Sequence, residues 1–194
     1  GRSQSVCISP NGKQIVTTSP ANTGRLWDMS GNPVGEPMRH DSFVFSIVYS
    51  PNGSQILTIV GRCNDREKNS IYFWDTSGHL VGKQIRDERW VNEVVFSPDG
   101  KLMLAKTDHK GQLLDNLGQS VGKPMFDEYG MMSSAVFSPD SKLILSCSTI
   151  GARFWDATGA ELRGLGLAMR RPSTAAFGRD GTQIFSTHRD HVSA

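Results

Sequence analysis

The chain has 194 residues, with 21 Lys and Arg against 19 Asp and Glu, and a formal net charge of +2. This length is enough for one sizeable domain or a short array of repeats. So balanced a charge gives no electrostatic reason to expect a nucleic acid or an anionic membrane as a partner. The apolar runs span only a few residues, whereas a membrane-spanning helix needs about 20, so we expect no membrane partner.

The N-terminus shows no charged segment followed by an apolar one, so no secretion signal is expected. The three cysteines, Cys7, Cys63 and Cys147, are odd in number and have no paired spacing. This argues against a disulfide framework and favours a reducing, cytoplasmic location. Cys7 and Cys147 lie in apolar runs and are expected to pack as small hydrophobic side chains. Cys63 lies among polar residues and is the candidate for a reactive thiol.

Two short phrases recur along the chain with a period of about 40 residues, which is typical of a repeat architecture. The first is S-P-[ND]-[GS], which begins at Ser9, Ser50, Ser97 and Ser138, with a degraded copy at Gly178. The second is an aspartate followed three residues later by glycine, at Asp28, Asp75, Asp115 and Asp156. Both phrases favour tight turns, because proline presets φ, the Asp side chain caps the turn and glycine suits its fourth position.

Runs that favour β-structure flank each turn, so one period predicts four short antiparallel strands. No stretch has the length and periodicity of a helix. The predicted strands are 5–9, 14–18, 24–28 and 33–38, then 44–50, 56–60, 71–75 and 80–85. The third unit has 91–97, 102–106, 112–115 and 120–125, and the fourth has 132–138, 143–147, 152–156 and 161–165. Two strands of a fifth unit fall at 173–178 and 183–187.

A four-stranded sheet of this size buries too little apolar surface to be stable alone, so such units are expected to stack on their neighbours. The first strand of each unit is apolar at consecutive positions, as in Ser46–Ser50 (SIVYS). Consecutive apolar positions are typical of a strand that is covered on both faces. The sequence therefore predicts an all-β fold of antiparallel sheets that cover one another.

An aromatic residue before the aspartate completes the second phrase. The pairs are Trp27-Asp28, Trp74-Asp75 and Trp155-Asp156, with Leu114-Asp115 as a remnant. With the S-P-[ND]-[GS] turns, these motifs resemble the WD-repeat family of β-propellers over essentially the whole chain. The connecting segment Gly31–Met38 (GNPVGEPM), with similar copies further on, looks most like bacterial members with tandem repeats. The alternative fold is a propeller of the TolB type, which shares the F-S-P-D-G phrase but lacks the recurring aromatic-W-D.

The resemblance implies one domain over residues 1–194, built of four-stranded antiparallel blades. The blades are expected at about 5–38, 44–85, 91–125 and 132–165, with a partial blade at 173–194. Closed propellers usually have four to eight blades. We therefore interpret the chain as a partial or open ring and favour a slice of a longer propeller. The alternatives are a half-ring completed by another copy and an open array docked on a partner.

The resemblance also implies that the recurring residues brace the architecture. In the family, a histidine before the first strand and an aspartate between the second and third strands belong to a buried hydrogen-bonded network. His40 fits the first place and Asp108 the second. The residues expected to be structural are Trp27, Asp28, Trp74, Asp75, Asp115, Trp155, Asp156, His40 and Asp108.

The family has a rim formed by the loops that enter the first strand and those that join the second strand to the third. Residues aligned before the turn proline form a column on this rim, and their types are common in protein interfaces. The polar loop Gly61–Asn69 lies on the same rim and is longer than its counterpart in the first unit. The predicted partner-binding residues are Phe43, Arg89, Trp90, Tyr129, Met131, Arg171, Arg62 and Arg66. They could equally well close the top of the core.

No nucleophile elbow, phosphate-binding loop or set of metal ligands stands out, so no catalytic residue, cofactor or metal is predicted. We expect a non-catalytic protein-interaction or sensor module, which could be the recognition part of a larger bacterial signalling or effector protein. The expected partner is another protein, another copy of the chain or the remaining blades. The alternative is a propeller with an enzymatic role that binds a small molecule or metal in its channel. The residues expected there, Phe45, Asn92 and Ser133, offer little chemistry.

Overall fold

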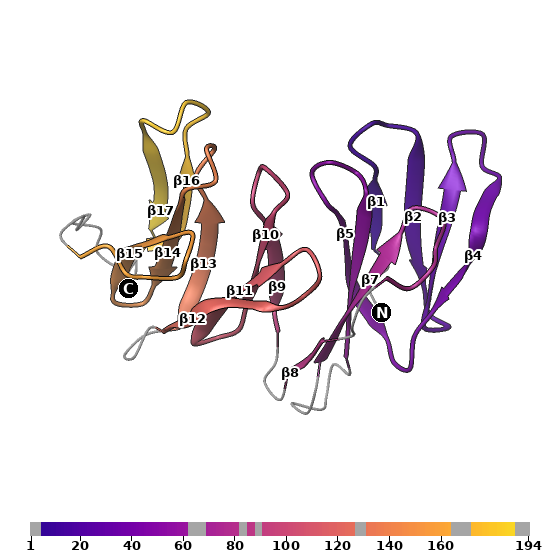
Figure 1. The fold of residues 1–194 in the computed structure, drawn as a ribbon, viewed down its shortest axis with the longest axis horizontal. Helices are drawn as coiled ribbons and strands as arrows, with labels where there is room; N and C mark the ends of the chain where they lie inside the picture. Colours follow the sequence, from indigo (N-terminus) through magenta and orange to yellow (C-terminus); the bar gives the residue numbers. More distant parts are fainter. Residues whose placement is uncertain are drawn as a thin grey trace, which may run out of the picture. The chain divides into compact units, whose positions relative to one another are not determined.

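The computed structural model describes residues 5–61, 69–81, 85–87, 91–126, 131–163 and 172–188 (Figure 1). Within these ranges all the regular structure is β, in antiparallel sheets of two to four strands that follow one another in chain order. This confirms the predicted all-β class. No described segment forms a helix that is long and apolar enough to cross a membrane. The chain divides into two compact units, Gly1–Glu93 and Val94–Ala194.

The first unit holds two four-stranded sheets, each an antiparallel meander. The first sheet consists of β1 (Val6–Ile8), β2 (Gln14–Ser19), β3 (Thr23–Asp28) and β4 (Pro33–Arg39). The second sheet consists of β5 (Val44–Tyr49), β6 (Gln55–Val60), β7 (Asn69–Asp75) and β8 (Ile85–Asp87).

The second unit holds three sheets, the first of which begins one residue before the boundary. The third sheet consists of β9 (Glu93–Phe96), β10 (Leu102–Lys106), β11 (Lys110–Asp115) and β12 (Ser120–Phe126). The fourth sheet has β13 (Met132–Phe137), β14 (Leu143–Ser148) and β15 (Gly151–Asp156). The fifth sheet has β16 (Pro172–Phe177) and β17 (Ile184–His188).

Two predicted outer strands differ from the observed ones. Where 80–85 was expected, the structure has an isolated bridge between Trp74 and Leu80, and β8 lies further on. Where 161–165 was expected, Glu161 forms an isolated bridge with Trp155. Residues 164–171 lie outside the described ranges, so the remainder of that predicted strand is not described.

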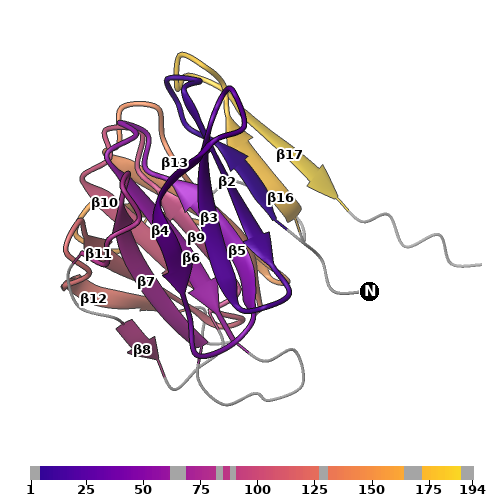
Figure 2. The ribbon, with the colours of Figure 1, turned by 90° about the vertical axis from the view of Figure 1, so that its right-hand side faces the viewer.

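The core of the first unit lies between its two sheets. Val16, Leu26 and Met38 from the first sheet pack against Ile47, Ile56 and Trp74, among others, from the second. Side chains alternate between the two faces of a strand, so β2 presents Val16 to the second sheet while β6 presents Ile56 to the first. The two sheets thus lie face to face (Figure 2).

The second unit repeats this packing twice. Leu104 and Leu113 of the third sheet pack against Ile144 and Trp155 of the fourth. On its other face, the fourth sheet packs Leu145, Cys147 and Phe154 against Ala175 of the fifth sheet. The middle strand β14 is therefore covered on both faces, and it is buried at five consecutive positions. This burial explains why Leu143, Ile144 and Leu145 are apolar at consecutive positions.

Glycines in the outer strands let neighbouring sheets approach closely. In β4, Gly35 has φ of +59°, and a Cβ atom there would overlap the carbonyl oxygen of Ser77 in the second sheet. In β12, Gly122 has φ of +63° and meets the carbonyl of Thr158 in the fourth sheet in the same way. At Gly35 and Gly122 the two sheets therefore approach so closely that only glycine fits.

Candidate functional site

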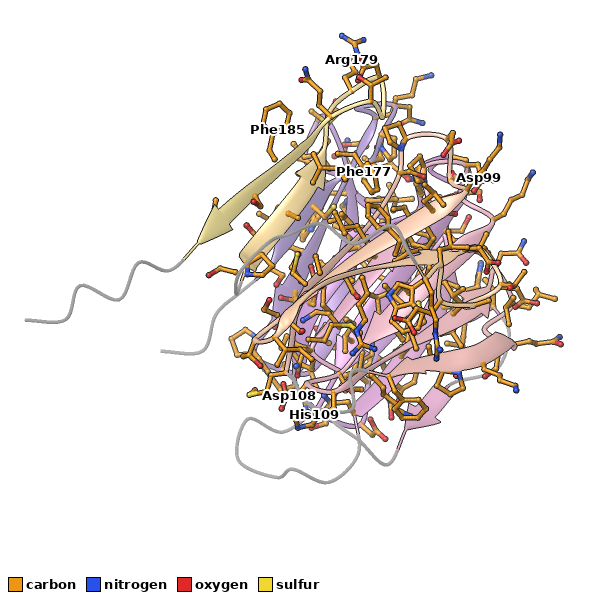
Figure 3. All side chains as sticks on the ribbon, turned by 90° about the vertical axis from the view of Figure 1, so that its left-hand side faces the viewer. Asp99, Asp108, His109, Phe177, Arg179 and Phe185 are labelled. Carbon is orange, nitrogen blue, oxygen red and sulfur yellow. The ribbon has the colours of Figure 1, made fainter. Side chains whose placement is uncertain are left out.

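The loops of each unit lie at two opposite ends of the sheets. One end carries the S-P turns and the D-x-x-G turns, and we call it the turn end. The other end carries the starts of the first strands and the loops between second and third strands, and we call it the rim. In the second unit, Figure 3 shows Asp99 and Arg179 at the turn end, and Asp108 and His109 at the rim. The loops that could form a shared site of the sheets in a unit therefore gather at these two ends.

Each S-P turn is held by a buried serine. The Ser9 hydroxyl donates to the Asn11 side-chain oxygen at 2.8 Å and accepts from the Gln14 backbone N–H at 2.9 Å. The hydroxyls of the other three serines accept the corresponding backbone N–H, also at 2.9 Å, at Ser50, Ser97 and Ser138. These hydroxyls therefore tie each turn to the start of its second strand.

Each D-x-x-G turn is capped by its aspartate. One carboxylate oxygen of Asp28 accepts the backbone N–H groups of Ser30 and Asn32 at 2.9 and 2.8 Å. The same oxygen accepts the corresponding pair of N–H groups at Asp75, Asp115 and Asp156. At Asp156, hydrogen bonds from the Thr158 hydroxyl and from backbone amides hold the pKa below its usual value. These four carboxylates are thus engaged in turn geometry.

The tryptophans of the repeat each donate a hydrogen bond to a hydroxyl on the neighbouring second strand. The indole N–H of Trp27 donates to Thr17 at 2.9 Å, that of Trp74 to Thr58 at 2.9 Å, and that of Trp155 to Ser146 at 2.8 Å. Trp74 and Trp155 are buried between two sheets, whereas Trp27 is half-buried. Each indole therefore lies on the same face of its sheet. A preceding sheet covers this face at Trp74 and Trp155, and no described sheet covers it at Trp27.

The third sheet lacks both partners of this hydrogen bond. Leu114 stands in the place of the tryptophan and Ala105 in the place of the hydroxyl, and both are buried. Because the donor and the acceptor are both replaced by apolar side chains, no buried polar group is left unpaired. A buried hydrogen bond that is removed in this way costs little free energy of folding. Sequence reasoning identified the missing tryptophan but not the matching loss on the second strand.

His40 extends the hydrogen bond of Trp74 into a chain. Its Nε2 lies 2.8 Å from the Thr58 hydroxyl oxygen and its Nδ1 lies 3.3 Å from the carbonyl oxygen of Asn22. Burial lowers the pKa of His40 to about 4, so the ring is neutral at neutral pH. A carbonyl can only accept, so we assign the proton to Nδ1, and the Thr58 hydroxyl then donates to Nε2. The chain connects a loop of the first sheet to a tryptophan of the second.

Asp108 lies in the loop that the resemblance assigns to this network. Its backbone carbonyl accepts the N–H of Met132 at 2.7 Å and so joins the third sheet to the start of β13. Lys106, which sequence reasoning missed, supports the same junction. It is buried, and its Nζ lies 3.4 Å from the carbonyl oxygen of Met132. No simple pattern marks Lys106 as buried, because lysine is usually exposed.

The structure describes two of the predicted rim residues, one in each unit. Phe43 is half-buried before β5, and its carbonyl accepts the N–H of Gly61. Met131 is 50% exposed before β13. The other predicted partner-binding residues lie outside the described ranges, namely Arg62, Arg66, Arg89, Trp90, Tyr129 and Arg171.

Two apolar residues at the rim of the second unit were not predicted. Ile150 is exposed in the loop between β14 and β15, and Phe126 is exposed at the end of β12. The pairing of Met132 with Ser148 places the start of β13 beside the end of β14. Met131 and Ile150 therefore lie at neighbouring strand ends. Exposed apolar residues that gather at one place are typical of interaction surfaces.

A hollow of about 370 Å³ lies at the turn end of the second unit, between the fourth and fifth sheets. Its polar lining includes Asp140 and Asp180, and Phe177 forms part of its apolar lining. Asp140 accepts from the Ser138 hydroxyl at 2.6 Å, and Asp180 accepts from the Thr182 N–H at 3.0 Å. Both carboxylates cap their own turns, and this hollow is not assigned a ligand.

Two of the three cysteines lie within the described ranges. Cys7 is half-buried and packs against the core of the first unit, and Cys147 is buried. Burial raises the pKa of the Cys147 thiol to about 11, which keeps it protonated. Cys63 lies outside the described ranges. Among the described residues, no three His, Cys, Asp or Glu side chains are grouped so that they could hold a metal ion.

No protein-family model matches the chain, and no curated protein matches it.

Proposed function

We propose that the chain is part of a WD-repeat β-propeller and that it acts as a non-catalytic interaction module. In this proposal each sheet is a blade and the partner, another protein, binds at the rim. The alternation of S-P and W-D turns supports the architecture, as does the face-to-face packing of successive sheets within each unit.

One observation carries the functional part of the proposal. The recurring polar side chains of the repeats are engaged inside their own sheets, whereas the rim of the second unit exposes Met131, Ile150 and Phe126. The aspartates cap turns and the indoles bind strand hydroxyls. Exposed methionine and aromatic side chains are enriched at protein interfaces and are available there for a partner.

The test compares two exposed apolar positions at opposite ends of the second unit. Met131 at the rim is 50% exposed and Leu117 in a turn is 52% exposed. Proteins captured by the wild type would be identified by mass spectrometry, purified and titrated against Met131→Ser, Ile150→Ser and Leu117→Ser. We expect the rim variants to weaken binding at least about tenfold and the turn variant to leave it unchanged.

The far-ultraviolet circular dichroism of each variant would establish that it folds. Equal affinity of all three variants for the purified partner would refute the rim as the binding surface. A partner that the Leu117 variant alone fails to bind would place the surface at the opposite end.

A further inference from the structure

Contacts between neighbouring sheets bring together two faces that recur along the chain. On the second strand, one apolar residue of each repeat faces the following sheet and is 0% exposed, at Val16, Leu104 and Leu145. On the first strand, a matching residue faces the preceding sheet and is buried, at Ile47, Ala135 and Ala175. Each contact thus joins what we call the trailing face of one sheet to the leading face of the next.

The trailing-face position is exposed on the fifth sheet, and the leading-face position is exposed on the first sheet. Phe185 in β17 occupies the place of Val16, Leu104 and Leu145, and it is 61% exposed. Its neighbour Ile184 packs toward the fourth sheet, and side chains alternate along a strand, so Phe185 points the other way. Figure 3 shows Phe185 projecting from β17 on the side away from Phe177.

The leading face of the first sheet is exposed in the same manner. Val6 in β1 occupies the place of Ile47 and is 68% exposed, and Ile8 is 57% exposed. Cys7, between them, packs toward the second sheet, which directs Val6 and Ile8 to the opposite side. The strand register then continues this face across the sheet, because Ile8 pairs with Ile15 and Ile15 pairs with Trp27.

Both exposed faces are apolar or uncharged at their centres. On the fifth sheet, Phe185 pairs with Ala176, and the hydroxyls of Thr174 and Thr187 bond to each other at 2.8 Å. On the first sheet, the row from Ile8 to Trp27 carries no charged side chain, and the neighbouring row from Val6 carries one, Arg25 on the third strand. Depletion of charge at the centre is typical of a protein interface.

We propose that the trailing face of the fifth sheet binds the leading face of the first sheet of a second copy of this chain. The reason for this occupant is that each face is one half of a contact that the chain already makes between consecutive sheets within its units. Phe185 would take the place that Leu145 has in the chain, and Val6 and Ile8 the places of Ala175 and Phe177. The two halves are different surfaces, so the association is head to tail.

The experiment measures mass against concentration by analytical ultracentrifugation of the full chain. The wild type is expected to increase in mass with concentration. Val6→Asp disables the leading face and Phe185→Asp disables the trailing face, and each should weaken self-association at least about tenfold. Both positions are exposed in the single chain, so folding should be retained, and circular dichroism checks this.

A mixture of the two variants distinguishes head-to-tail binding from symmetric binding. The Val6→Asp chain keeps an intact trailing face and the Phe185→Asp chain keeps an intact leading face, so the mixture should form a dimer with near wild-type affinity. The control is Leu117→Asp, which introduces the same charge at a similarly exposed position outside both faces. It should associate like the wild type.

Three results would overturn the proposal. The first is a wild-type chain that stays monomeric over the whole concentration range. The second is a mixture that associates no better than either variant alone. The third is a Leu117→Asp variant that loses association as the face variants do, since that would show non-specific contact.

Discussion

The Thr58 hydroxyl accepts a hydrogen bond of 2.9 Å from the indole N–H of Trp74. The same hydroxyl lies 2.8 Å from Nε2 of His40, so one side chain joins a loop residue to a buried indole. Thr58 is fully buried and Trp74 nearly so. Water therefore cannot take the place of the Thr58 hydroxyl in either hydrogen bond, so both bonds should contribute to the stability of the fold.

Thr58→Val should lower the free energy of unfolding by about 2–3 kcal/mol, because the shape is kept while two buried polar groups lose their partner. The matched control is Thr17→Val, at the same place in the first sheet. There the indole of Trp27 is half-buried and can bind water, so we expect a loss of about 1 kcal/mol or less. Urea unfolding followed by tryptophan fluorescence measures both, and equal losses would contradict the difference in burial.

The neutral state of His40 predicts a loss of stability in mild acid. Its folded pKa of about 4 lies below the ordinary value of 6.5, so between these values the unfolded chain binds a proton that the folded chain does not. Stability should therefore fall as the pH decreases from 6.5 toward 4, by roughly 1–3 kcal/mol from this group.

The control for this prediction is His40→Gln, which does not titrate. The stability difference between wild type and variant should shrink as the pH falls from 6.5 to 4 and stay constant below that range. Urea titrations at several pH values measure it. A difference that does not change with pH would show that His40 has an ordinary pKa in the folded chain.

Tyr49→Phe should stabilise the protein. The Tyr49 side chain is buried, and its hydroxyl finds no hydrogen-bond partner in the structure as described. Burial also raises its pKa to about 12. Phenylalanine occupies the corresponding place in later repeats, at Phe96, Phe137 and Phe177. Removing the unpaired hydroxyl should raise the free energy of unfolding by about 1 kcal/mol. Thermal unfolding measures this, and a lower melting temperature would reveal a partner for the hydroxyl.

Gly35→Ala tests the close approach of sheets in the first unit. A Cβ atom there would overlap the carbonyl of Ser77, so the two sheets would have to separate. Gly12→Ala is the control, because Gly12 has a similar φ of +67° but open space around it. We expect Gly12→Ala to cost about 1 kcal/mol for its backbone conformation alone, and Gly35→Ala about 2 kcal/mol more. Similar costs for both would mean that the contact with Ser77 can relax freely.

Much of the fold is predictable because its signals are local. A serine hydroxyl and an aspartate carboxylate hold turns of four to six residues, so Ser9 and Asp28 mark strand ends without knowledge of anything distant. The position of Met131 at the rim also follows from its alignment with the turn proline. Its exposure, and that of Ile150, depends on what lies beside them in space and could not be predicted in the same way.

The sequence by itself determined the order of the strands, their antiparallel pairing and the residues that make the turns. Only the tertiary structure decided which face of each sheet is covered. Val16 and Phe185 hold the same place in the repeat, yet one is 0% and the other 61% exposed. The physical reason is that burial requires a neighbouring sheet, and no residue's identity states whether that neighbour is present.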